Sequence, residues 1–341
     1  MGLSLTSCQK KQENPPAASN SLFDFHVYSL SGPTMGTSYN IKLILPPSRS
    51  NELESLSQDV KATLADIEKK MSTYQRDSEL SLFNASLQGS WFTVSDALFT
   101  VISAAQALSD RSFGAFDSTV GPLVNLWGFG PSHQLDKVPT ETELAKAFAR
   151  VGYKKLLLDR KASRIKKEGD IYLDLSAIAK GYGVDQVMEL LLSKNITSAL
   201  VEVGGEIRAI GLKPSGNAWR IAIESPLANT RAIQKVIDIK DMALATSGDY
   251  RNYFEKDGLR YSHTINPETG KPITHTLASV TVLHENCMMA DGLATMFMVM
   301  GPDRALEYAN KNNHSIFMLV KSEGGFTEIM SQSFIELFGI Q

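Results

Sequence analysis

Residues 199–210, with the sequence ALVEVGGEIRAI, decide the fold class of this 341-residue chain. The stretch has strand composition, being rich in valine and isoleucine, and two adjacent glycines interrupt it. The same composition recurs at residues 219–223, 236–239, 280–283 and 316–320. Because short turns rather than regular crossover helices join most of these strands, the pattern favours an α+β fold with mixed or antiparallel strands over a doubly wound sheet.

Other segments have the periodicity of a half-buried strand or of amphipathic helices. Residues 39–45 alternate apolar and polar side chains, which is typical of a half-buried strand. Between Leu53 and Met71 the apolar residues are spaced by three and four, which predicts an amphipathic helix with Asn51 and Glu54 in capping-box positions. Further helices are expected at residues 95–109, 139–152, 184–192, 291–300 and 303–310.

Composition and charge exclude several classes of protein. Hydrophobic residues make up 43% and charged residues 21%, which excludes a mostly disordered chain, a coiled coil and a collagen-like repeat. Lys and Arg number 34 against 37 for Asp and Glu, so no basic excess is available for nucleic acid. Only two cysteines are present, Cys8 and Cys287, which is too few for a typical zinc or iron–sulfur site. We find no apolar run of 18 residues that would predict a transmembrane helix.

The first twenty residues differ from the rest of the chain. They are small, polar and Pro-containing, so we expect a tail and linker at 1–20 and one globular domain at 21–341, with a division into two subdomains left open. The tetrapeptide Leu5-Thr6-Ser7-Cys8 resembles the end of a bacterial lipoprotein signal, in which the cysteine is lipidated. We therefore expect a membrane-anchored protein at the periplasmic face of the inner membrane or at the cell surface. If residues 1–7 are the native start, we expect a cytoplasmic protein instead.

Four segments combine Gly with Asp, Glu, Ser or Thr in a way that a plain core does not require. Glycine lets the backbone approach a ligand closely, and its amides can bind phosphate, but each segment is equally compatible with an ordinary turn. We find no Walker motif and no well-placed dinucleotide fingerprint. The four segments are 114–122, 174–183, 202–206 and 246–250.

Asp291 and Thr295 are four residues apart, so their oxygens lie on one face of the predicted helix. A carboxylate and a hydroxyl are hard ligands that suit Mg²⁺ rather than Zn²⁺. The alternative is that Asp291 caps the helix and Thr295 packs through its methyl group.

His263 is expected at the end of a short strand, just before an Asn-Pro turn, and polar residues surround it more densely than any other histidine. It could act as a general base near neutral pH or play a structural role. Tyr74, after the first helix, could stack on a flat ring or simply pack.

The order of the short motifs resolves these alternatives, because the chain resembles the ApbE-type FAD:protein FMN transferases over residues 31–300. The motifs occur in the order expected of that family, and eight in register make chance similarity improbable. They are PTMGT at 33–37, MSTY at 71–74, AFD at 115–117, DLSAIAKG at 174–181, VGGE at 203–206, TSG at 246–248, HTINP at 263–267 and ADGLAT at 290–295.

The resemblance implies an enzyme that binds FAD and Mg²⁺, transfers the FMN half to a threonine or serine hydroxyl of an acceptor protein, and releases AMP. His263 matches the candidate base that takes the hydroxyl proton, and Asp291 is implied to be essential through the metal. The flavin-contacting positions match Met35, Tyr74, Ala115, Phe116 and Asp117. Other FAD-contacting positions match Asp174, Lys180, Ser247 and His263, and the metal ligands match the Ala177 carbonyl, Asp291 and Thr295.

The family's acceptors are flavin-carrying subunits of membrane redox complexes, such as sodium-pumping NADH:quinone reductase. Two other activities remain open from the residues alone. The same site could hydrolyse FAD to FMN and AMP with water as the nucleophile, or the chain could be a non-catalytic FAD-binding lipoprotein. Retention of Asp291, Thr295 and Lys180 argues against simple storage, because storage needs no metal at the pyrophosphate. An oxidoreductase is disfavoured, since no redox partner residues stand out.

Overall fold

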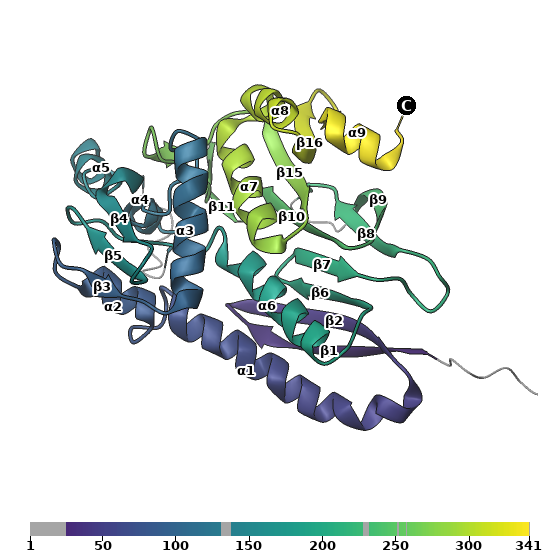
Figure 1. Ribbon diagram of the computed structural model, residues 1–341. Coiled ribbons are helices and arrows are strands. Elements are labelled where there is room, and N and C mark those ends of the chain that lie inside the picture. Colours follow the sequence, from purple (N-terminus) through teal and green to yellow (C-terminus); the bar gives the residue numbers. More distant parts are fainter. Residues whose placement is uncertain (1–24, 131–137, 228–231, 251, 257, 341) are drawn as a thin grey trace, which may run out of the picture.

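A computed structural model describes residues 25–130, 138–227, 232–250, 252–256 and 258–340 (Figure 1). Within these ranges the centre is an eight-stranded sheet of order β1-β2-β6-β7-β10-β15-β16-β17 in which every neighbouring pair is antiparallel. The α+β prediction is therefore confirmed. The strands are β1 His26–Thr34, β2 Thr37–Leu45, β6 Ala199–Val203, β7 Glu206–Ile210, β10 Met242–Gly248, β15 Leu277–His284, β16 Ser315–Ser322 and β17 Gly325–Met330.

Three helices cover one face of the sheet. Helices α6 (Ala179–Ser193) and α7 (Cys287–Met300) pack on each other and on the central strands, and α1 (Leu53–Met71) packs along α6 (Figure 1). Leu64 of α1 and Val187 of α6 belong to one buried apolar cluster with strand residues. The apolar spacing that predicted α1 therefore describes the stripe that it buries.

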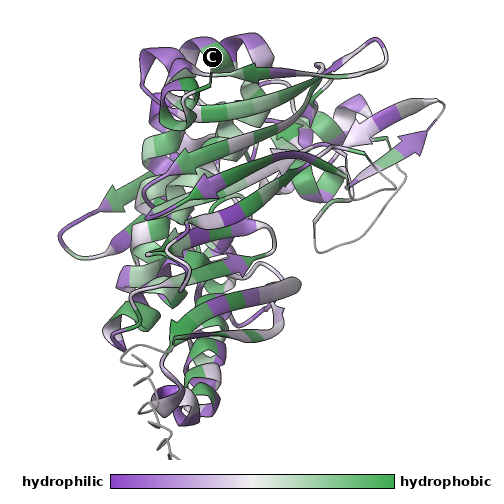
Figure 2. Ribbon diagram, turned by 90° about the vertical axis from the view of Figure 1, so that its right-hand side faces the viewer, coloured by the Kyte–Doolittle hydropathy of each residue, from purple (hydrophilic) through white to green (hydrophobic). Residues whose placement is uncertain are grey.

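The opposite face of the sheet is covered by a hairpin and a short helix. The hairpin consists of β8 (Trp219–Glu224) and β9 (Ile233–Ile239), and the helix is α9 (Gln332–Phe338). Phe317 of β16 packs in this layer, whereas the adjacent Met318 packs on the helical side. The central strands are thus buried on both faces, and Figure 2 shows long hydrophobic stretches along them.

The remaining elements lie beside α3 (Asp96–Arg111), which packs against α7 and ties them to the sheet (Figure 1). No helix in the described part of the chain is long and apolar enough to cross a membrane. These elements are α2 Glu79–Ala85, β3 Phe92–Thr93, α4 Gly121–Leu126, α5 Glu141–Phe148, β4 Leu156–Asp159, β5 Arg164–Lys167, β11 Tyr253–Lys256, β12 Leu259–Ser262, β13 Ile265–Asn266 and β14 Lys271–Pro272. Helix α8 (Pro302–Lys311) packs instead on α7 and β16.

Several helix ends differ from the sequence prediction, and among them α6 and α7 begin at Ala179 and Cys287, before the predicted starts at 184 and 291. The capping box of Asn51 and Glu54 is wrong, because a 3₁₀ turn over Pro47–Glu52 precedes α1 and holds Asn51. Pro47 starts that turn, since its fixed φ suits a first helical position. The predicted helix at 139–152 ends as α5 at Phe148, and Lys155 Nζ donates to carbonyls beyond that end.

Candidate active site

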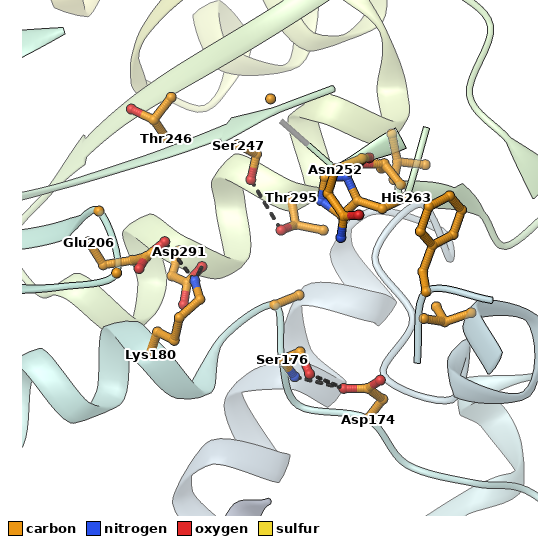
Figure 3. Close-up of a pocket in the computed structure, with 18 of the residues that line it drawn as sticks. Asp174, Ser176, Lys180, Glu206, Thr246, Ser247, Asn252, His263, Asp291 and Thr295 are labelled. Carbon is orange, nitrogen blue, oxygen red and sulfur yellow. Dashed lines mark hydrogen bonds and ion pairs between the residues drawn. The ribbon is translucent and has the colours of Figure 1, made fainter. Parts of the chain in front are cut away.

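Most of the residues singled out from the sequence line one cavity of about 670 Å³, whose walls come from α6, α7, strand β8, the central strands and the segments around α3 (Figure 3). They come from segments far apart in the chain, so the fold is needed to bring them together. Met35 is the exception among them and does not line this cavity. The residues that do are Tyr74, Ala115, Phe116, Asp117, Asp174, Ala177, Lys180, Ser247, His263, Asp291 and Thr295.

Met35 instead shapes the turn between β1 and β2. Its φ is +47°, and its backbone N–H donates to Glu68 Oε1 of α1 at 2.7 Å. Its side chain lies close to Gly183 of α6. The flavin contact that the resemblance implies for Met35 therefore stays a prediction.

Lys180 lies between two carboxylates at the start of α6. Its Nζ is 2.7 Å from Glu206 Oε1 and 3.8 Å from Asp291 Oδ1 (Figure 3). Burial opposes the charge on Lys180, but the two carboxylates outweigh this effect and hold the pKa of its ammonium above the usual value. Burial likewise raises the pKa of both the Glu206 and the Asp291 carboxyl groups, with Lys180 acting in the opposite direction. The cluster presents one cation and two acidic groups to the cavity.

Asp291 lies in the second turn of α7, and Asn286 caps that helix through a bond from the Met289 N–H. The alternative in which Asp291 caps the helix is therefore wrong. The helix starts earlier than predicted because the Asn286 side chain, and not Asp291, accepts a hydrogen bond from a first-turn N–H, that of Met289. Asp291 Oδ2 accepts a 2.9 Å hydrogen bond from the Gly181 N–H, which ties α7 to α6.

The oxygens expected to hold Mg²⁺ fit a hard divalent cation. Ala177 precedes Ile178, the N-cap residue of α6, so its carbonyl lies outside the helix ladder, and the first-turn Gly181 N–H bonds Asp291 instead. Thr295 Oγ1 lies on the same helix as Asp291 and is 3.3 Å from Ser247 Oγ. Across the described residues no three His, Cys, Asp or Glu side chains form a metal cluster, so a cation here would depend on carbonyl and hydroxyl oxygens too.

Ser247 lies at the end of β10. The glycine-containing segment around it had suggested a turn instead. Strand β10 begins at Met242, directly after the predicted strand at 236–239. Its residues Ala243, Leu244 and Ala245 are buried but weakly patterned, so no alternation marked it as a strand. The strand aims Ser247 at Thr295 and so connects the sheet to α7.

His263 follows β12 directly, as predicted, and lies across the cavity from Lys180 (Figure 3). Its Nδ1 is 3.0 Å from the carbonyl oxygen of Asn252, and a carbonyl can only accept. Nδ1–H is therefore the donor, and Nε2 of the neutral ring keeps a free lone pair. Burial lowers the pKa of the imidazole, which favours this neutral form.

The two aspartates on the α3 side already have internal partners. Asp117 Oδ1 accepts from the Thr119 N–H and hydroxyl at 2.7 and 2.6 Å, and Oδ2 accepts from Tyr153 N–H at 3.1 Å. Asp174 Oδ1 accepts from the N–H and hydroxyl of Ser176. Burial raises the pKa of Asp117, although these hydrogen bonds oppose the shift. Asp117 thus organises its loop.

Tyr74 is 60% exposed at the cavity rim, and its stacking on a flat ring stays a prediction. Burial of its hydroxyl, followed by the nearby Asp174 carboxylate, raises its pKa. The packing alternative for Tyr74 does not fit a ring so exposed.

Two groups of the site, the Glu206 carboxylate and the Asn252 carbonyl, had no role predicted from the sequence. In the sequence Glu206 belongs to a glycine-containing segment and has no predicted role, although a carboxylate immediately after two glycines is a signal for a group held against the site. Asn252 acts through its backbone carbonyl, and no side-chain pattern could have indicated it.

Comparisons with known proteins agree with this arrangement. The ApbE family model matches residues 35–319. The FAD:protein FMN transferase of Vibrio cholerae is 49% identical over 306 residues, which cover 89% of this chain and 91% of that protein. The enzyme of the same name from Haemophilus influenzae is 44% identical over 342 residues, with 99% and 95% covered.

Solved structures show the same fold. The flavin transferase ApbE from Vibrio cholerae has a TM-score of 0.85 at 46% identity and covers 92% of this chain and 99% of its own. The apo form of Pseudomonas stutzeri flavinyl transferase ApbE has a TM-score of 0.86 at 42% identity, with 94% and 99% covered. The resemblance found in the sequence motifs is confirmed, and the chain belongs to the ApbE family.

Proposed function

We propose that this chain transfers the FMN moiety of FAD to a threonine or serine hydroxyl of an acceptor protein and releases AMP. Family membership supports the proposal, because the curated relatives are named FAD:protein FMN transferase. The observation that bears most directly on it is that one cavity places Lys180 and Asp291 on one wall and the His263 imidazole on another. Such a cavity can hold a pyrophosphate between charge-stabilising groups and a base.

Lys180, Asp291, Thr295 and the Ala177 carbonyl would serve the phosphate end. Asp291, Thr295 and the carbonyl would hold Mg²⁺, which when bound supplies a Lewis acid to the pyrophosphate. The Lys180 ammonium is an additional positive charge for the phosphate oxygens. Their combined effect is to stabilise negative charge on the transferring phosphoryl group.

His263 would serve the acceptor. A hydroxyl is a poor nucleophile at neutral pH, and Nε2 of the neutral imidazole can take its proton as the oxygen attacks. A bond forms between the acceptor oxygen and the FMN phosphorus, the bridging P–O bond of FAD breaks, and AMP leaves. A base positioned in this way typically contributes about 10²–10⁴-fold to the rate.

The test is a reaction with FAD, Mg²⁺ and a flavin-carrying acceptor domain, followed by a denaturing gel under ultraviolet light. We expect a fluorescent acceptor band that EDTA abolishes. A dark acceptor with AMP and free FMN in solution would establish the hydrolase instead. Intact FAD with neither product would leave a flavin-binding role.

We also propose flavin-carrying subunits of membrane redox complexes, such as sodium-pumping NADH:quinone reductase, as acceptors, and a lipid on Cys8 as an anchor at the periplasmic face of the inner membrane. The signal-like tetrapeptide at 5–8 and the polar tail after it support the anchor. Cys8 lies outside the described residues. Mass spectrometry of the native N-terminus tests this, and an unlipidated Met1 or Gly2 would contradict it.

A further inference from the structure

Glu206 is a buried carboxylate whose two oxygens have different surroundings. It begins β7 directly after the Gly204-Gly205 turn, and the residue is 4% exposed. Oε1 is 2.7 Å from Lys180 Nζ, whereas Oε2 is buried with no hydrogen-bond partner in the described chain. A carboxylate in such a place is costly unless its charge is used, and among the described residues Lys180 is the cation that pairs with it.

The distances show which carboxylate holds the lysine. Lys180 Nζ is more than an ångström closer to Glu206 Oε1 than to Asp291 Oδ1, at 2.7 against 3.8 Å. Asp291 Oδ2 is occupied by the Gly181 N–H, so Oδ1 is the oxygen that Asp291 retains for another ligand. If the Glu206 charge were lost, Asp291 would be the only carboxylate in the described part of the chain left within ion-pair distance of the ammonium.

We propose that Glu206 is a positioning residue that holds Lys180 away from Asp291 and so keeps Asp291 Oδ1 available for the divalent cation. The proposal rests on the function proposed above, in which Asp291 holds Mg²⁺ and Lys180 faces the pyrophosphate. Glu206 acts through Lys180 and is not itself a ligand. The nearby Gly204 leaves room for the lysine stem, because a Cβ there would lie 2.8 Å from Thr37 Cγ2 and 3.3 Å from Lys180 Cδ.

Mg²⁺ binding without FAD separates this role from a general contribution to folding. The Mg²⁺-dependent rise in melting temperature, at constant ionic strength, would be followed for the wild type, Glu206→Gln, Lys180→Met and the double variant. We expect Glu206→Gln to weaken Mg²⁺ binding about tenfold or more, because the freed ammonium then competes for Asp291. The double variant should bind Mg²⁺ as well as Lys180→Met alone, since the competitor is gone.

Glu202→Gln is the matched control. It removes a negative charge from the same cavity wall, but Glu202 bonds Gly205 N–H and Asn40 rather than Lys180. An equal loss of Mg²⁺ affinity in this control would reduce the effect to general charge and overturn the proposal. Unchanged Mg²⁺ affinity in Glu206→Gln, or no Mg²⁺ binding by the wild type, would also overturn the proposal. A double variant that binds Mg²⁺ as weakly as Glu206→Gln would overturn it too, because Glu206 would then be a ligand.

The outcome does not depend on FMN transfer, because neither FAD nor an acceptor is present. A chain that binds Mg²⁺ with the expected pattern but transfers no flavin would contradict the proposed function and support the role of Glu206. The melting transition itself shows whether each variant is folded.

Discussion

His263 shows how a single hydrogen bond fixes the chemistry of a residue. The Asn252 carbonyl accepts from Nδ1–H, so Nε2 is the basic nitrogen. Its polar surroundings left His263 as a general base or a structural residue, and the family resemblance implied that it is the candidate base. The sequence could not predict the tautomer, because the partner is a backbone atom eleven residues earlier. The same limit applies to Lys180, whose ion pairs join α6 to β7 and α7.

The pH dependence of transfer should report His263. Burial lowers the pKa of its imidazole, so the neutral, basic form persists below the usual value of about 6.5. We expect kcat/KM to fall as the pH is lowered, with a midpoint below 6.5, and His263→Gln to lose this acid limb. A midpoint above 6.5, or a limb that survives in His263→Gln, would contradict the assignment.

Asp291→Ala should cost more activity than His263→Ala. The histidine variant loses a base worth about 10²–10⁴-fold, whereas the aspartate variant loses the carboxylate that holds the cation and the tie to Gly181. Initial rates at saturating Mg²⁺ measure both, with melting curves to confirm folding. Comparable losses would count against this ranking.

At the scale of elements, α6 and α7 make the site by approaching each other closely. The periodic helices α1 and α3 were predicted almost to the residue, because their apolar stripes match the surface that they bury. Short elements such as α4 and α9, and strand β10, were not predicted, since a few residues contain too little pattern. The start of α7 was misplaced for a similar reason: its first turn is as apolar as the turns after it.

Gly181→Ala should separate the two helices. A methyl group there would overlap the Cys287 carbonyl oxygen and lie 2.8 Å from Asp291 Cβ, both in α7. We expect a loss of about 1–3 kcal/mol in the free energy of unfolding, measured by denaturant titration, together with weaker Mg²⁺ binding.

Gly183→Ala is its control in the same helix. The new methyl group would meet Met35 Cε at 3.1 Å, the end of a flexible side chain, and alanine favours a helix over glycine by up to about 1 kcal/mol. We expect little net change in stability. If Gly181→Ala and Gly183→Ala were equally stable, the close approach of α6 and α7 would not be the reason for a glycine at 181.

At the scale of the molecule, a second apolar layer covers the face of the sheet away from α7. The α+β class followed from short connections between strands, but the strand order did not, because β1 pairs with β2 and β2 with the distant β6. The sequence also could not show that the motifs from 71–74 to 290–295 share one cavity. Their order along the chain indicated the family, and only the fold explains why those positions belong together.

Phe317→Ala should destabilise the protein without changing its chemistry. Phe317 is 1% exposed and packs on Phe334 of α9, on the face of the sheet away from α7. We expect a loss of about 3–5 kcal/mol in the free energy of unfolding and an unchanged kcat/KM below the unfolding temperature. Leu87→Ala, at an 80% exposed position, should change stability by less than about 0.5 kcal/mol. Equal effects of the two would contradict the layered core.

The central claim is that the cavity transfers FMN to a protein rather than to water. The most direct measurement is the ratio of AMP released to flavin bound covalently to the acceptor, determined by chromatography and by the absorbance of the denatured acceptor. We predict one AMP for each covalent flavin and none in Asp291→Ala. Release of AMP together with free FMN, while the acceptor stays unlabelled, would contradict the claim.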